Sequence, residues 1–149
     1  MGIPARESGF SLIELSVGLA VMGIVAAIAL PRWSSLLPTY ALNNSLRQVQ
    51  SELHHIKMRA AAENVSYQLA YQQGAAAYTI QRDAKAIVSR PLADGTTITK
   101  DGTIAFSPRG TARANRVRLR NSAGACKQIV VSATGRVRVC TPKSCNEDC

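Results

Sequence analysis

The sequence predicts an α+β fold, in which a long N-terminal helix packs on an antiparallel β-sheet. Three observations lead to this prediction: an apolar run from Phe10 to Leu30, a helical stripe of apolar residues after it, and short alternating segments separated by glycine turns in the remainder. The chain has 149 residues and one apolar segment long enough to cross a bilayer. These features exclude a large multidomain enzyme and a multi-span transporter.

The apolar run contains 21 residues with a single charge, Glu14. At about 1.5 Å per residue the helix would measure about 31 Å, which matches a hydrocarbon core of about 30 Å. A secretory signal peptide would need a positive segment first, a shorter apolar run, and a small-residue cleavage site after that run. Here the small residue Gly9 precedes the run, so cleavage after Gly9 would keep the helix in the mature protein.

Glu14 is the unusual residue of this segment, because a carboxylate inside a membrane-spanning helix costs about 2.5–3.5 kcal/mol on insertion scales. Such a group needs a partner. The simplest partner is an α-amino group, and cleavage after Gly9 would create one at Phe10, four residues away.

The order Gly9-Phe10-Ser11-Leu12-Ile13-Glu14 before an apolar helix resembles the class III signal of type IV pilins and type II secretion pseudopilins. The resemblance implies a leader peptide of residues 1–9, cleavage between Gly9 and Phe10 by a prepilin peptidase, and N-methylation of Phe10. It implies that Glu14 acts in filament assembly, paired with the terminal amine of a neighbouring pilin or pseudopilin. It also implies a single-pass inner-membrane protein whose head lies in the periplasm before it joins a pilus or pseudopilus.

The amphipathic part of the helix follows the apolar run. Its stripe has helical spacing and consists of Leu42, Leu46, Val49, Leu53, Ile56 and Ala60. We therefore predict one helix over about 11–62, with a transmembrane or filament-core segment at 10–31 and an amphipathic segment at 32–63. His54 and His55 would point about 100° apart on this helix, so solvated histidines are favoured over a metal site.

Residues 64–149 are predicted to form a β-rich head with a cysteine-containing tail. Val65, Tyr67, Leu69 and Tyr71 alternate with polar residues, as in a half-buried strand. Further strands are predicted at 76–82, 85–89, 96–99, 103–107, 115–120, 127–132 and 136–140, with glycine turns between most of them. The segments Phe106–Gly110 and Gly135-Arg136-Val137-Arg138 resemble the GspH/FimT family of minor pilins and pseudopilins, which implies a pilin-like fold.

The positive charge is concentrated in the last third of the chain. The formal net charge is +9, and nine basic residues with no acidic residue lie between Gly102 and Asn146. Because side chains alternate across a strand, the arginines of each predicted strand should face solvent together: Arg116, Arg118 and Arg120 on one, Arg136 and Arg138 on the other. Arg113, Lys127 and Lys143 could extend this face.

Arginine suits phosphate because its planar fork donates two hydrogen bonds. The resemblance to FimT-type minor pilins implies double-stranded DNA binding in natural transformation, through a Gly-Arg-x-Arg motif that corresponds to Gly135–Arg138. The predicted DNA-binding residues are Arg116, Arg118, Arg120, Arg136, Arg138 and Lys143. No aromatic residue is interleaved, which argues against single-strand stacking, and five phosphate contacts predict a log–log salt slope of about −4 to −5.

Other interpretations of the basic residues stay open. The face could be merely solvated, or it could dock an acidic neighbouring pilin or anionic lipid headgroups in a purely structural minor pilin. The chain could also be a GspH-type pseudopilin of type II secretion that recognises proteins.

Four cysteines, Cys126, Cys140, Cys145 and Cys149, allow three disulfide pairings in an oxidising periplasm. Pairing of Cys126 with Cys140 is favoured, because they flank one predicted hairpin, and Cys145 would then pair with Cys149. A four-cysteine zinc site is disfavoured by the spacing. No nucleophile–base–acid set, phosphate loop or dinucleotide fingerprint is present, so we expect neither an enzyme nor a cofactor or metal.

Overall fold

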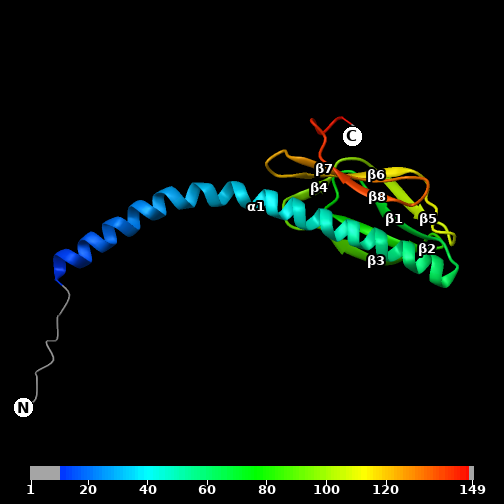
Figure 1. Ribbon diagram of the computed structural model, residues 1–149, viewed down its shortest axis with the longest axis horizontal. Helices are drawn as coiled ribbons and strands as arrows, with labels where there is room; N and C mark the ends of the chain where they lie inside the picture. Colours follow the sequence, from blue (N-terminus) through cyan, green and yellow to red (C-terminus); the bar gives the residue numbers. More distant parts are fainter. Residues whose placement is uncertain (1–10, 148–149) are drawn as a thin grey trace, which may run out of the picture. The chain divides into compact units, whose positions relative to one another are not determined.

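The computed structural model describes residues 11–147, and within this range it describes the side chains of all residues except 30–35. Helix α1 runs without interruption over Leu12–Glu63, which confirms the predicted helix to within one residue at each end (Figure 1). The chain divides into two units, one up to Leu36 and one from Leu37 onward. Each unit is described here by itself.

The first unit contains the segment Leu12–Ala29, which has a mean hydropathy of 2.3 and is long and apolar enough to cross a membrane. Its large apolar side chains are exposed, for example those of Leu12, Met22 and Ile28. Exposed apolar residues on every side of a helix are typical of a membrane span or of a helix covered by other subunits.

The second unit begins with the amphipathic part of α1, and the predicted stripe is confirmed there. All six residues from Leu42 to Ala60 are at most 6% exposed. The helix ends at Glu63 because Asn64 adopts a left-handed conformation with φ 53°, and the amide of Val65 then donates to the carbonyl of Ala60 at 3.3 Å.

Eight antiparallel strands follow in the described part of the chain, each within two residues of a predicted strand. They are β1 (Tyr67–Tyr71), β2 (Ala77–Arg82), β3 (Lys85–Pro91), β4 (Thr96–Ile98), β5 (Gly102–Phe106), β6 (Asn115–Asn121), β7 (Cys126–Val131) and β8 (Val137–Cys140). They form two four-stranded sheets with the orders β3-β2-β1-β5 and β4-β6-β7-β8. Figure 1 shows the strands of this unit beside the second half of α1.

The division into two sheets follows from the partners of β4 and β5. These strands are joined by a loop of three residues, yet β4 pairs with β6 whereas β5 pairs with β1. The core nevertheless remains one cluster, because Leu53 of α1, Leu69 of β1 and Ile129 of β7 are buried in it together. All core residues among those described lie between Leu42 and Val131, so the unit from Leu37 onward contains its own core and is treated below as a separable head.

Five turns of the described chain contain a glycine that the sequence predicts, whereas the turn between β2 and β3 contains none. Gly74, Gly95, Gly110, Gly124 and Gly135 all have positive φ. The turn between β2 and β3 instead consists of Asp83 and Ala84, with φ of 46° and 65°. Two positive φ values are what a two-residue hairpin of the right twist needs, but alanine gives no sequence signal for it.

Candidate functional site

The last three strands form the predicted meander, and their register brings the arginines onto one side. Arg116 pairs with Val130, which pairs with Arg138, so two arginines flank one row of the sheet. Arg120 pairs with Cys126 at the other end of β6. Residues of the opposite parity, Val117, Leu119, Ile129 and Val131, are buried in the core. We call the side away from the core the basic face, which comprises Arg116, Arg118, Arg120, Arg136 and Arg138.

Four of these five arginines are exposed: Arg116, Arg120, Arg136 and Arg138. Arg136 lies in the turn before β8, where its carbonyl accepts from the amide of Ser132 at 3.0 Å and its own amide donates to the Ser132 hydroxyl at 3.2 Å. This hairpin geometry gives Arg136 the same parity as Arg138.

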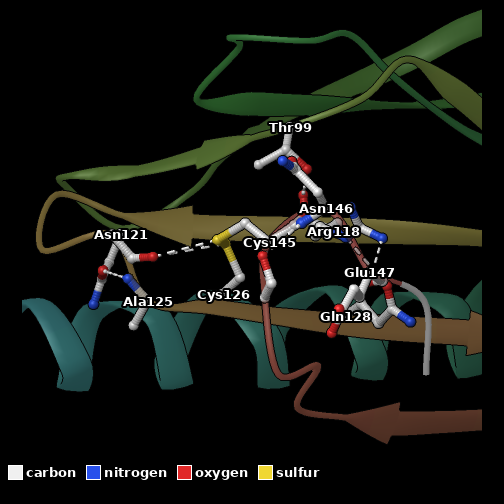
Figure 2. Close-up of a disulfide and its surroundings, with 11 residues drawn as sticks. Thr99, Arg118, Asn121, Ala125, Cys126, Gln128, Cys145, Asn146 and Glu147 are labelled. Atoms are coloured by element: carbon white, nitrogen blue, oxygen red, sulfur yellow. Dashed lines mark hydrogen bonds between the residues drawn. A yellow bond between two sulfur atoms is a disulfide. The ribbon is translucent and has the colours of Figure 1, made fainter.

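Arg118 differs from the prediction, because it is half-buried beneath the C-terminal tail (Figure 2). Its Nε donates to Oε1 of Gln128 at 3.2 Å, its Nη1 donates to the carbonyl of Cys145, and its Nη2 donates to the carbonyl of Glu147 at 2.8 Å. The expectation that Arg118 faces solvent with its neighbours is therefore wrong. The reason is that the tail folds back over β6 and takes the guanidinium as its hydrogen-bond donor.

The favoured disulfide pairing is also wrong. Cys126 bonds to Cys145, with their Cα atoms 5.4 Å apart (Figure 2). Cys140 lies opposite Gln128 rather than opposite Cys126, so the hairpin register does not bring the two cysteines face to face. Cys140 is disulfide-bonded as well, and Cys149 lies outside the described residues. Disulfide-bonded cysteines offer no thiolate, so a zinc site built on Cys126, Cys140 and Cys145 is not formed.

The three residues expected to extend the face are placed differently from one another. Lys127 lies on the core side of β7, where its Nζ donates to Oδ1 of Asn43 on α1 at 2.6 Å, so it does not belong to the basic face. Its pairing with Leu119, a core residue, explains this orientation. Arg113 is exposed before β6, and Lys143 is exposed in the tail.

Ion pairs among the described residues lie away from the basic face. Glu63 binds Arg59 at 3.1 Å and Arg82 at 3.4 Å, and His55 lies 3.6 Å from Glu52. A hydrogen bond from Tyr67, together with the two arginines, lowers the pKa of Glu63 below its usual value. In the described part of the chain, therefore, no ion pair neutralises Arg120, Arg136 or Arg138.

The turn that carries Arg136 is fixed by contacts that the sequence does not signal. Lys57 of α1 donates from Nζ to the carbonyl of Gly135 at 3.0 Å. Gly135 has φ 73°, and a Cβ at this position would overlap the carbonyl oxygen of Gly110 in a neighbouring turn. Only glycine permits both the conformation and the close approach. The glycine of the Gly-Arg-x-Arg motif therefore positions the arginines after it.

The N-terminal motif lies at the edge of the described chain. Glu14 is in the first turn of α1 and is exposed. Gly9 and Phe10, between which cleavage is predicted, lie outside the described residues.

Two profiles of known families match the chain, one over its N-terminal apolar segment and one over most of the head. Residues 4–30 match the family profile described as a prokaryotic N-terminal methylation motif, and residues 45–135 match the profile described as type II transport protein GspH. No curated protein matches the chain at a significant level.

Two crystal structures of the type IV minor pilin FimU of Pseudomonas aeruginosa (strain PAO1) share the fold. The P21 form has a TM-score of 0.55 at 13% identity, and the match covers 70% of this chain and 94% of the crystallised FimU chain. The P65 form has a TM-score of 0.54 at 15% identity, covering 70% and 99%. Because the GspH profile covers more than half of the sequence and the methylation motif precedes it, the chain belongs to the GspH family of type IV minor pilins and pseudopilins.

Proposed function

We propose that this protein is a minor type IV pilin that binds the backbone of double-stranded DNA through its basic face, as a component of DNA uptake in natural transformation. The observation that carries the proposal is the set of four exposed arginines, Arg116, Arg120, Arg136 and Arg138, on one side of a rigid three-stranded meander. Arginine forks on a rigid sheet bind phosphate oxygens without reading base sequence. The binding should therefore be non-specific and dependent on salt.

The number of phosphate contacts follows from the exposure of the arginines. Arg118 already donates to the tail, and no ion pair among the described residues neutralises Arg120, Arg136 or Arg138, so we count three contacts in place of the five expected from the sequence. Three contacts predict a log–log salt slope of about −2.7 for duplex DNA. A slope near zero would contradict binding through phosphate.

The direct experiment measures binding of a fluorescent 30-bp duplex, a length chosen as roughly three helical turns, to the head from residue 37 onward. The variant Arg136→Ala/Arg138→Ala should bind at least about tenfold more weakly at low salt and should reduce the magnitude of the salt slope by about 1.8. The matched control is Lys85→Ala/Arg90→Ala, which removes the same charge from exposed positions of β3 in the other sheet. Equal affinities of the two double variants would refute the proposal.

In the cell we propose that the protein starts as a single-pass inner-membrane precursor with its head in the periplasm. Prepilin peptidase would cut between Gly9 and Phe10, methylate Phe10, and so prepare the chain for assembly with other pilins through Glu14. Co-expression with a prepilin peptidase followed by mass spectrometry tests this, because the product should lack residues 1–9 and carry one methyl group. An uncut product would overturn the processing step.

The second candidate function is that of a type II secretion pseudopilin. It is favoured by the description of the matched family, type II transport protein GspH. Deleting the gene and measuring both transformation and protein secretion separates the two functions. Loss of pili in the Arg136/Arg138 variant with unchanged DNA affinity of the head would instead support a structural role in docking an acidic neighbouring pilin.

A further inference from the structure

Two glycine turns of the head are in direct contact with each other. Gly110 lies in the turn between β5 and β6, and Gly135 lies in the turn between β7 and β8. A Cβ built on Gly135 would overlap the carbonyl oxygen of Gly110, and the amide of Ala112 donates to the carbonyl of Ala133 at 3.0 Å. These contacts fix the two turns side by side, although the turns are far apart in the sequence.

Lys57 of α1 lies against both turns. Its Nζ donates to the carbonyl of Gly135 at 3.0 Å, and its Cε is 3.5 Å from a Cβ built on Gly110. A carbonyl is neutral, so this hydrogen bond holds the ammonium in place without cancelling its charge. It also uses only one of the three donors of the ammonium. Lys57 therefore brings a fixed positive charge, half-buried, to the place where the turns meet.

Two arginines adjoin the contacting glycines in the sequence. Arg109 precedes Gly110, Arg136 follows Gly135, and both arginines are exposed. Because the two glycines are in contact, the two arginine side chains start from adjacent points of the surface. The contact between the turns thus gathers Lys57, Arg109 and Arg136 from three separate elements.

The charge at the contact of the two turns favours an anion. The two turn segments, residues 107–113 and 132–136, contain no acidic residue. The ion pairs formed by the described residues involve none of the three cations, Lys57, Arg109 and Arg136. Like charges that are held close together repel one another, so an anion bound between them would relieve this repulsion.

We propose that the contact of the two glycine turns is a binding site for one phosphate group, held by Lys57, Arg109 and Arg136. Arginine forks donate pairs of hydrogen bonds, and a tetrahedral phosphate accepts hydrogen bonds from several directions, which suits donors from a helix and two turns. Lys57 and Arg109 were not among the predicted DNA-binding residues, because only the fold brings α1 and the turn between β5 and β6 beside the Gly-Arg-x-Arg motif.

That the phosphate belongs to a DNA backbone rests on the proposed function. Arg136 is already counted there as one phosphate contact, and Lys57 and Arg109 would hold the same phosphate. The number of phosphates, and with it the expected salt slope of about −2.7, therefore does not change. Free phosphate has the same chemistry, and the experiment separates the two sources.

Three single substitutions in the head from residue 37 onward test the site, and each removes the charge of one exposed arginine. Arg109→Gln changes the proposed site. Arg120→Gln changes the far end of the basic face, because Arg120 pairs with the start of β7 whereas the site adjoins the end of β7. Arg90→Gln changes β3 of the other sheet. Lys57→Gln is a fourth variant, in which glutamine keeps a donor for the carbonyl of Gly135.

Two probes are used with each variant. Binding of inorganic phosphate is followed by NMR chemical-shift titration of the amides of Gly110 and Gly135, and binding of the 30-bp duplex is followed by fluorescence anisotropy at several salt concentrations. Arg109→Gln should weaken binding of both probes about threefold or more and leave the salt slope unchanged, because the same phosphate remains bound. Lys57→Gln should do the same.

The two control variants should behave differently from Arg109→Gln. Arg120→Gln should weaken binding of DNA and reduce the magnitude of the salt slope by about 0.9, with no change in binding of inorganic phosphate. Arg90→Gln should change neither probe.

The outcomes distinguish this proposal from the proposed function. If Arg109→Gln behaves like Arg90→Gln with both probes, the turn site is overturned, and loss of DNA binding in Arg136→Ala/Arg138→Ala would still support the proposed function. If Arg109→Gln weakens binding of inorganic phosphate alone, the site takes free phosphate and its role in DNA binding is overturned. If it lowers the magnitude of the salt slope by about 0.9 with unchanged binding of inorganic phosphate, Arg109 holds a phosphate of its own and the shared site is overturned.

Discussion

Replacing Gly135 by alanine should destabilise the head by about 3–5 kcal/mol. Gly135 has φ 73°, a conformation that costs an alanine about 1 kcal/mol. The new Cβ would also overlap the carbonyl oxygen of Gly110, and relieving such an overlap costs typically about 1–3 kcal/mol. When the turn moves, the 3.0 Å hydrogen bond from Lys57 to the Gly135 carbonyl weakens, which costs about 1 kcal/mol more.

Gly74→Ala provides a matched control, because Gly74 has φ 76° but nothing lies within 4 Å of a Cβ built there. This variant should lose only the conformational cost, about 1 kcal/mol. Thermal unfolding of the head followed by far-UV circular dichroism should show a fall in Tm of about 15 °C for Gly135→Ala and about 5 °C for Gly74→Ala. Equal falls would refute the argument that the close approach of the two turns requires glycine.

Three further predictions concern the tail and the core. The variant Cys126→Ser/Cys145→Ser should lose about 3 kcal/mol in urea unfolding, because the disulfide closes a loop with a sequence separation of 19; a loss below about 0.5 kcal/mol would show that the tail is not held by this bond. Arg118→Ala should cost about 1–3 kcal/mol, because it removes three hydrogen bonds, whereas the exposed Arg120→Ala should cost less than about 0.5 kcal/mol; the reverse order in urea unfolding would contradict the placement of Arg118 under the tail. Burial raises the pKa of Tyr71 to about 12, so the folded head holds this proton more tightly than the unfolded chain does, and stability that is complete below pH 10 should fall as the pH rises from about 10 to 12. Tyr71→Phe should flatten that fall in unfolding midpoints measured across this range, and an unchanged pH profile would argue against the assignment.

Much of the fold could be predicted because its signals are local. The apolar stripe of α1 repeats with the helical period, and the strands alternate with period two, so each element follows from its own residues. The division of the strands into two sheets has no such signal. It depends on the pairing of β4 with β6 and of β5 with β1, and both pairings join segments that are distant in the sequence.

The positions of the side chains in the candidate site could likewise be predicted only in part. The parity of the strands correctly predicted that Arg116, Arg120 and Arg138 share a face, since pairing in a meander follows from chain order. Arg118 has the same parity as its neighbours, yet it is half-buried, because the tail that covers it has no period from which its path could be inferred. Lys127 was misplaced although its parity, which it shares with Ile129, already puts it on the core side; only the fold brings Oδ1 of Asn43 within reach of its ammonium.

The sequence by itself determined four features: the processing motif, the membrane-length apolar helix, the antiparallel meander and the concentration of charge after Gly102. Each of these depends only on the order of neighbouring residues or on a short repeat period. Only the tertiary structure decided which arginines remain exposed and which cysteine joins Cys126. The physical reason is that these features arise where segments far apart in the chain come together. A disulfide and a half-buried guanidinium depend on distance in space rather than on spacing in sequence.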